Sequence, residues 1–236
     1  MHQFRAVIFD WRGTLVTTLS SQDWVQAALR LLGRDDRPEA VAGVLAAITE
    51  AAGQPDRLAA PGVDRDAAVH RATYHGVFTA AGLDVDLADA LYAVESDAAH
   101  NEFAVDVAPV LRAISTHGLR IAVVSDIHFD VRPAFVAAGI ADLISVFVLS
   151  YEHGVQKPDP EIFQHALDRL GALPKETLMV GDRHEYDGAA LDVGMTTLLL
   201  PPLNDVRHER LGLVARLLGV PLGDVPLRPA HSDAPA

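Results

Sequence analysis

Short apolar runs rich in β-branched residues recur along the chain and predict buried strands. The five runs are Phe4–Phe9, Leu119–Val124, Ile144–Leu149, Thr177–Val180 and Thr196–Leu200. Apolar residues at helical spacing follow between the later runs, at Val131–Ala138, Pro160–Leu170 and Ala189–Val193. Because buried strands that alternate with helices form parallel sheets with both faces covered, the pattern predicts an α/β fold with a doubly wound, Rossmann-like parallel sheet.

The stretch from residue 21 to residue 100 has a different pattern, because Ala, Leu and Val recur there at helical spacing. We therefore predict a helical domain of four helices at residues 17–103, inserted after the first strand. The core domain then consists of residues 1–16 and 104–220, with hinges at residues 16–20 and 101–106. Residues 221–236 are rich in Pro and predict a flexible tail.

Composition narrows the class of protein. The 236 residues are 50% hydrophobic and 22% charged, which is typical of a globular chain long enough to fold without disulfides. A formal net charge of −13 disfavours nucleic acid and anionic membranes as partners. The chain has no cysteine, no leader-like N-terminus and no stretch approaching the roughly 18 apolar residues that span a membrane. We expect a cytoplasmic protein that acts on a small molecule. The sequence does not indicate its oligomeric state.

Three polar residues directly follow predicted strands: Asp10, Ser125 and Asp182. Because the carboxyl ends of parallel strands meet at one edge of a sheet, we expect these side chains to converge. Asp10 is a carboxylate that can attack phosphorus or carbon as a nucleophile. The Ser125 hydroxyl can donate a hydrogen bond to an oxygen of a transferring phosphoryl group.

Further groups near these strand ends suit an anionic substrate and a hard cation. The ammonium of Lys157 can offset the charges of a nucleophile and a phosphate, and Thr14 offers a hydroxyl and an N–H to the same anion. Asp182 and Asp187 supply carboxylate oxygens, the ligands that Mg²⁺ prefers. Without a cation, these carboxylates would repel a phosphate, so the sequence predicts Mg²⁺ as the cofactor.

Four segments in this order, FDWRGTLV, VVSD, GVQKPDPEIF and VGDRHEYDGA, resemble the motifs of the haloacid dehalogenase superfamily. The resemblance covers the chain from Phe4 to about Leu200, and it is to members with a helical cap inserted after the first motif. It implies a hydrolase, and the metal-binding form of the last motif implies a Mg²⁺-dependent phosphatase of a small phosphorylated metabolite.

The resemblance also implies a role for each matching residue. Asp10 is the nucleophile and forms an aspartyl-phosphate, with Ser125 and Lys157 as its catalytic partners. The expected contacts to the substrate phosphate are Arg12, Thr14, Ser125 and Lys157. The expected metal ligands are Asp10, the backbone carbonyl of Arg12, Asp182 and Asp187. The segment from Asp187 to Gly194 is one residue shorter than is usual in the family, so a structural role for Asp187 stays open.

Arg12 departs from the phosphatases of this family, which carry a second Asp at this place to protonate the leaving group. A guanidinium stays charged and transfers no proton, so about 10²–10⁴-fold of rate is missing unless another group supplies it. In one hypothesis, Arg12 clamps the phosphate of a substrate whose leaving group needs little protonation. In another, Asp126, His128 or a cap residue replaces the missing acid. Alternatively, turnover is lost and the protein is a phosphate-ligand binder or regulatory relative.

Other branches of the family fit less well. Phosphonoacetaldehyde hydrolases need a cap lysine, but residues 15–105 contain none. Haloacid dehalogenases do not need Mg²⁺ and carry Ser and Asn around a single Asp in the fourth motif, so dehalogenation of a 2-haloacid is the weakest hypothesis. One polar cluster in the predicted cap is interpreted as an ordinary helix face: His70, Arg71, Tyr74 and His75.

Overall fold

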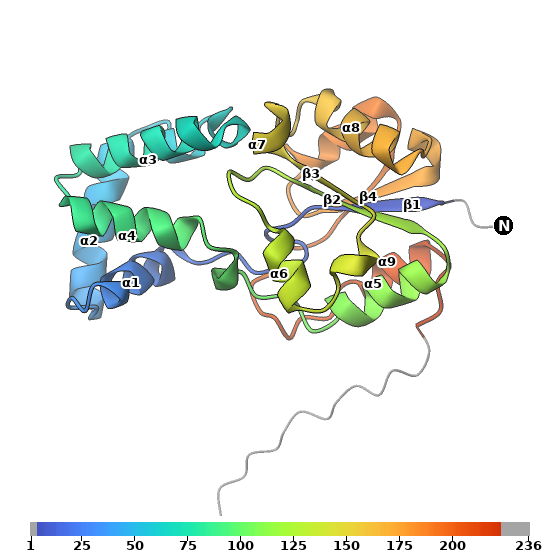
Figure 1. Ribbon diagram of the computed structural model, residues 1–236, viewed down its shortest axis with the longest axis horizontal. Coiled ribbons are helices and arrows are strands. Elements are labelled where there is room, and N and C mark those ends of the chain that lie inside the picture. Colours follow the sequence, from blue (N-terminus) through green and yellow to red (C-terminus); the bar gives the residue numbers. More distant parts are fainter. Residues whose placement is uncertain (1–3, 223–236) are drawn as a thin grey trace, which may run out of the picture.

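A sheet of parallel strands forms the centre of the larger lobe of the molecule (Figure 1). The computed structural model describes residues 4–222, so residues 223–236 of the predicted tail lie outside the described residues. The strands are β1 (Ala6–Phe9), β2 (Arg120–Ser125), β3 (Val146–Leu149), β4 (Thr177–Gly181) and β5 (Thr196–Leu199). Their order, β3-β2-β1-β4-β5, places β1 in the middle. Each strand overlaps a predicted run, which confirms the α/β fold class.

Helices cover both faces of this sheet (Figure 1). The α-helices of the core are α5 (Val107–Thr116), α6 (Arg132–Ala137), α7 (Ser150–His153), α8 (Pro160–Leu170) and α9 (Gly212–Leu217). Short 3₁₀ helices are η4 (Ala141–Leu143), η5 (Pro174–Glu176) and η6 (Asp187–Val193). Val7 and Phe9 of β1 share an apolar cluster with α5, α6 and α9, whereas Ala6 and Ile8 share one with α8. Alternate residues of one strand therefore fill both cores.

The helix predicted at Ala189–Val193 forms as the 3₁₀ helix η6, which begins two residues earlier, at Asp187. Gly194, with a φ of +84°, ends the segment after seven residues. So short a segment, bounded by a turn on each side, has no room for a longer α-helix.

The segment between β1 and α5, which we call the insert (residues 17–103), is helical and packs to one side of the sheet (Figure 1). Its α-helices are α1 (Ser21–Leu31), α2 (Pro38–Ala52), α3 (Ala67–Ala80) and α4 (Val85–Glu95). Its 3₁₀ helices are η1 (Arg57–Ala59), η2 (Val63–Arg65) and η3 (Ala98–His100). Side chains of Ser20, Asp66 and Asp84 cap α1, α3 and α4 by accepting N–H groups of the first turn. The insert buries an apolar core of its own, built around residues such as Trp24 and Leu91.

The two linkers that join the insert to the core run beside each other. Val16 forms an antiparallel bridge with Phe103, and the Thr17 N–H donates to the Glu102 carbonyl over 2.9 Å. The Asn101 side-chain amide donates to the Thr17 carbonyl over 3.0 Å. These contacts fall within the predicted hinges. Among the described residues, no helix has the length and apolar character that crossing a membrane requires.

Candidate active site

Asp10 stands at the centre of the carboxyl edge of the sheet. It follows β1 directly, and its N–H donates to the Val180 carbonyl of β4 over 2.9 Å. The parallel register pairs Phe9 with Val123 of β2 and with Val180, so both neighbouring strands end beside Asp10. The Asp10 residue is only 6% exposed. A nucleophile at this place is held by the backbone of the most central strand.

Lys157 reaches the same edge from the loop before α8. Its Nζ donates to Asp10 Oδ1 over 2.5 Å and to Asp187 Oδ1 over 2.6 Å. The Lys157 N–H is itself held by Asp126 Oδ1, at 2.8 Å. The structure therefore brings Asp10, Lys157 and Asp187 together, as the sequence predicts, although they are far apart in the chain.

Burial dominates the electrostatics of this group. It raises the pKa of Asp10 to about 7, although Lys157 acts in the opposite direction. Burial alone would lower the pKa of Lys157, but the carboxylates of Asp10, Asp187 and Asp126 outweigh it and raise that pKa. Lys157 therefore keeps its positive charge at neutral pH, where it can face both a carboxylate and a phosphate.

Three carboxylates, those of Asp10, Asp182 and Asp187, offer oxygens that all lie within 4.8 Å of one another. Asp187 Oδ2 accepts the N–H groups of Asp182 and Arg183, at 3.1 and 3.0 Å. Burial and the Asp187 charge raise the pKa of Asp182. One ammonium does not balance three neighbouring carboxylates, of which those of Asp10 and Asp187 are buried, so the set of donors fits a hard divalent cation such as Mg²⁺.

Two glycines make room for these carboxylates. Gly13 has a φ of +80°, and a Cβ there would overlap the Asp182 carboxylate. A Cβ at Gly181 would overlap the Asp187 carboxyl group in the same way. The Thr14 hydroxyl, which is fully buried, donates to Asp182 Oδ1 over 3.4 Å. Ser125 ends β2 and is 2% exposed, so it occupies the neighbouring strand end.

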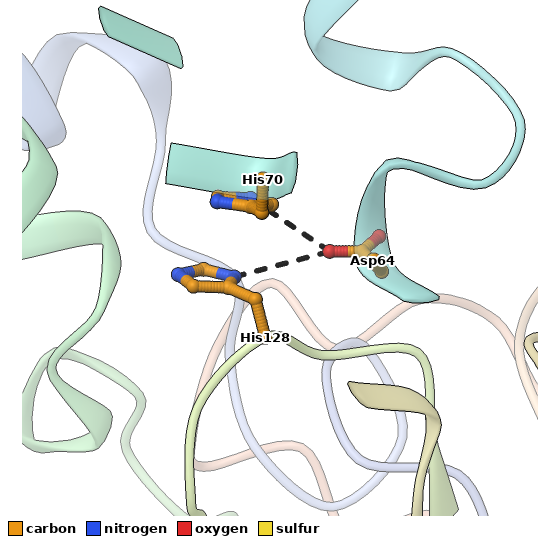
Figure 2. A group of neighbouring side chains, drawn as sticks. All are labelled: Asp64, His70 and His128. Carbon is orange, nitrogen blue, oxygen red and sulfur yellow. Dashed lines mark ion pairs between the residues drawn. The ribbon is translucent and has the colours of Figure 1, made fainter. Parts of the chain in front are cut away.

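A second polar cluster lies where the insert meets the core (Figure 2). Asp64 of η2 and His70 of α3 come from the insert, and His128 comes from the loop after β2. Asp64 Oδ1 lies 3.7 Å from His70 Nε2 and 3.8 Å from His128 Nδ1. Burial, helped by His128, lowers the pKa of His70 to about 3, so this imidazole is neutral at neutral pH.

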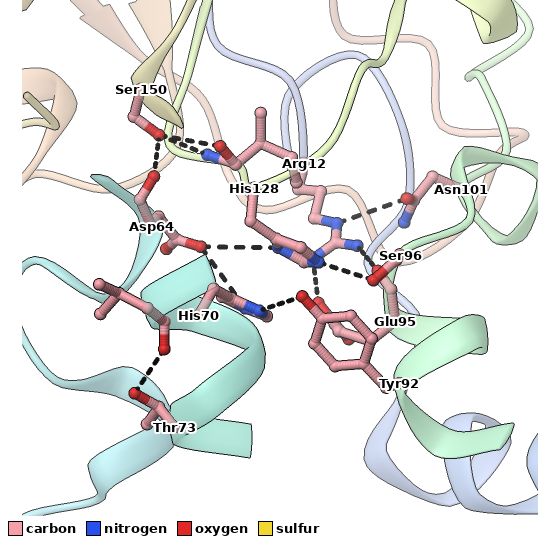
Figure 3. Close-up of polar contacts among 12 residues, drawn as sticks. Arg12, Asp64, His70, Thr73, Tyr92, Glu95, Ser96, Asn101, His128 and Ser150 are labelled. Atoms are coloured by element: carbon pink, nitrogen blue, oxygen red, sulfur yellow. Dashed lines mark hydrogen bonds and ion pairs between the residues drawn. The ribbon is translucent and has the colours of Figure 1, made fainter. Parts of the chain in front are cut away.

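Arg12 binds the insert (Figure 3). Its Nη1 donates to Glu95 Oε1 over 2.7 Å and its Nη2 to the Glu95 carbonyl over 3.0 Å, at the end of α4. Its Nε donates to Asn101 Oδ1 over 3.3 Å. The guanidinium therefore ties the loop that carries Asp10 to the insert, an arrangement that favours a positioning role over a phosphate clamp.

Asp64 and Glu95 are functional candidates that the sequence pattern does not reveal. In the sequence, His70 and His128 have the pattern of ordinary polar residues of a helix face and a loop. Arg12 and Glu95 are 83 residues apart in the chain, so only the placement of the insert brings them together. The one available signal is that His128 stands three residues after the end of β2, close to Ser125.

Comparison with known proteins gives a family for this arrangement. The sequence model of the haloacid dehalogenase-like hydrolases matches residues 4–192. A glyceraldehyde 3-phosphate phosphatase from Methanopyrus kandleri is 37% identical over 95 residues, which cover 39% of this chain and 41% of the relative. The chain therefore matches less than half the length of this curated relative.

Solved structures share the fold. A HAD phosphatase from Thermococcus onnurineus superposes with a TM-score of 0.62 at 24% identity, over 92% of this chain and 99% of the other. A HAD family enzyme from Bacteroides thetaiotaomicron was solved in complex with magnesium and inorganic phosphate. It superposes with a TM-score of 0.60 at 18% identity, over 86% of this chain and 96% of the other.

Proposed function

Because the chain belongs to the haloacid dehalogenase-like hydrolases, we propose that it is a Mg²⁺-dependent phosphatase of a small phosphorylated metabolite. The observation that carries this proposal is the convergence of Asp10, Lys157, Asp182 and Asp187 at one edge of the sheet. The phosphatase named among the relatives supports the same class of substrate.

The proposed reaction has two steps at Asp10. Lys157 binds Oδ1 of Asp10, which leaves Oδ2 to attack phosphorus. The new P–O bond forms an aspartyl-phosphate, and the bond to the leaving group breaks so that its oxygen keeps the electron pair. Water then cleaves the aspartyl-phosphate, which releases phosphate and restores Asp10.

Other residues stabilise the negative charge of the phosphoryl group and position the carboxylates. Lys157 and Ser125 bind the phosphoryl oxygens, and Thr14 orients Asp182. Asp10, Asp182 and Asp187 would hold the cation, together with the backbone carbonyl of Arg12 that the family resemblance implies. A Mg²⁺ ion bound there would neutralise negative charge that otherwise opposes the attack.

Arg12 restricts the choice of substrate, because no acid stands two residues after the nucleophile. A leaving group that needs little protonation, as in an acyl or aryl phosphate, fits this site best. The same residue favours a second candidate function, binding of phosphate esters without turnover, since its guanidinium is bound to Glu95.

A substrate panel tests both candidates. We expect phosphate release from an activated aryl phosphate that requires Mg²⁺ and that is lost in Asp10→Asn. Ester binding without multiple turnover by the wild-type protein would instead support the second candidate. Release of halide from a 2-haloacid in the presence of a chelator would contradict both.

A further inference from the structure

The cluster of Asp64, His70 and His128 has unusual spacing. The two nitrogens that face Asp64 Oδ1 lie 3.7 and 3.8 Å from it, which is too long for hydrogen bonds. Two ligands of one tetrahedral ion, with bonds of about 2.1 Å, lie about 3.4 Å apart. The spacing is therefore close to that of atoms that share a cation.

Hydroxyl groups bind the outer nitrogens of both imidazoles (Figure 3). The Tyr92 hydroxyl lies 3.3 Å from His70 Nδ1, and Ser96 Oγ lies 2.9 Å from His128 Nε2. When each outer N–H donates to its hydroxyl, the inner nitrogens present lone pairs to the Asp64 carboxylate. Metal-binding histidines are held in this manner by a partner on the nitrogen opposite the ion.

Burial makes this arrangement costly without a cation. His70 is 1% and His128 4% exposed, and His128 Nδ1 is buried with no hydrogen-bond partner. With both outer N–H groups donating to the hydroxyls, three acceptors converge without a donor and repel one another. A bound cation removes this repulsion and gives the buried nitrogen a partner.

We propose that Asp64, His70 and His128 form a site for a first-row transition-metal ion such as Zn²⁺, separate from the acidic cluster at Asp10. Imidazole nitrogens favour such ions, whereas Mg²⁺ favours the all-oxygen set at Asp10. The imidazole rings of His70 and His128 stack with their centroids 3.4 Å apart and an interplanar angle of 10°. The rings therefore tilt away from each other when both bind one ion.

The site joins the two lobes, because Asp64 and His70 belong to the insert and His128 to the core (Figure 2). Ser150 of the core reinforces this junction, since its Oγ donates to the Asp64 carbonyl over 2.7 Å. The ion therefore fixes the insert against the core. The proposal does not depend on phosphatase activity.

Spectroscopic titration with Co²⁺ tests the site on the full chain after removal of metals by a chelator. Excess Mg²⁺ is present throughout to fill the acidic cluster. We expect saturable visible absorption from a single equivalent of Co²⁺, which Zn²⁺ displaces. His70→Gln and His128→Gln each lower the Co²⁺ affinity by more than about tenfold, and Tyr92→Phe lowers it by about tenfold through the outer nitrogen.

His75→Gln is the matched control, because His75 lies on the same helix and faces a different carboxylate, that of Asp89, at 3.8 Å. It should leave the Co²⁺ affinity unchanged. The proposal is wrong if the wild-type protein shows no saturable Co²⁺ absorption, or if Mg²⁺ displaces the bound Co²⁺. It is also wrong if binding survives both histidine substitutions and is lost in Asp182→Asn.

Discussion

Arg12 stands two residues after Asp10 and connects the core to the insert. Its guanidinium joins the loop that carries Asp10 to Glu95 and Asn101 of the insert. The sequence shows that the side chain at this position cannot transfer protons, but it does not indicate which residues the guanidinium binds. That partner depends on how the insert sits over the sheet.

A double-mutant cycle on Arg12→Gln and Glu95→Gln measures the strength of this connection. Both side chains are partly buried, at 26% and 19% exposed, so we expect a coupling energy of about 1 kcal/mol in urea unfolding. The cycle should also show that the double variant loses no more phosphatase activity than Arg12→Gln alone. Purely additive effects on both measurements would show that the ion pair has no positioning role.

Asp126 offers a test of the pH dependence of stability. Burial raises its pKa from 3.8 to about 6, so the charged form destabilises the folded state as the pH rises from about 4 to 6. Asp126→Asn removes this cost and keeps the oxygen that accepts the Lys157 N–H. The full shift corresponds to about 3 kcal/mol, and because the side chain is half-buried we expect about 1–2 kcal/mol more stability than wild type at pH 7.

Unfolding in urea at several pH values checks the sign of this effect. The difference between Asp126→Asn and wild type should shrink as the pH falls from 7 towards 4. A difference that stays constant or grows in acid would mean that Asp126 is not held with a raised pKa.

At the scale of elements, the sheet and α8 follow closely from the sequence. The run at Pro160–Leu170 gives α8 at the predicted bounds, because Pro160 begins it and Gly171 ends it. The strand ends also bring Asp10, Asp182 and Asp187 together as expected. Local periodicity carries this information, since β-strands at the centre of a parallel sheet are apolar on both faces.

The contact between the loops after β1 and β4 depends on Gly13. We expect Gly13→Ala to displace the Asp182 carboxylate and to weaken Mg²⁺-dependent activity by more than tenfold. The left-handed backbone alone costs an alanine about 1–2 kcal/mol, an energy of the same order as this loss. Calorimetric titration with Mg²⁺ and activity assays measure the effect.

Gly43→Ala is the matched control, because Gly43 lies within α2 and a Cβ added there would meet open space. Alanine favours a helix over glycine by about 1 kcal/mol, so this variant should be more stable and equally active. If Gly13→Ala binds Mg²⁺ as tightly as wild type, the close approach of the two loops does not shape the metal site.

At the scale of the whole molecule, the contacts between the insert and the core could not be predicted from the sequence. Arg12 with Glu95, His128 with Ser96 and Asp64, and Ser150 with Asp64 all pair residues from separate lobes. Sequence periodicity describes each lobe but carries no information on their relative placement. Periodicity therefore does not predict that His70, His128 and Asp64 come together, although each residue is visible in the sequence.

The fully buried Ser150 offers a test of this junction. Its Oγ binds the Asp64 carbonyl and accepts the Ile127 N–H over 2.8 Å. Ser150→Ala leaves these groups unpaired, so we expect a loss of about 1–3 kcal/mol in stability and faster hydrogen exchange at η2. The exposed Ser145 gives the control variant, Ser145→Ala. Equal exchange in both variants would show that Ser150 does not hold the insert.

The central claim is that a cation held by Asp182 and Asp187 lets Asp10 bond to a phosphoryl group. The most direct measurement is ¹⁹F NMR of the protein with fluoroberyllate, a mimic of the aspartyl-phosphate that needs no knowledge of the substrate. We expect a bound fluoroberyllate signal that requires Mg²⁺ and that disappears in Asp10→Asn. A wild-type protein that binds no fluoroberyllate in the presence of Mg²⁺, or a signal that persists in Asp10→Asn, would contradict the claim.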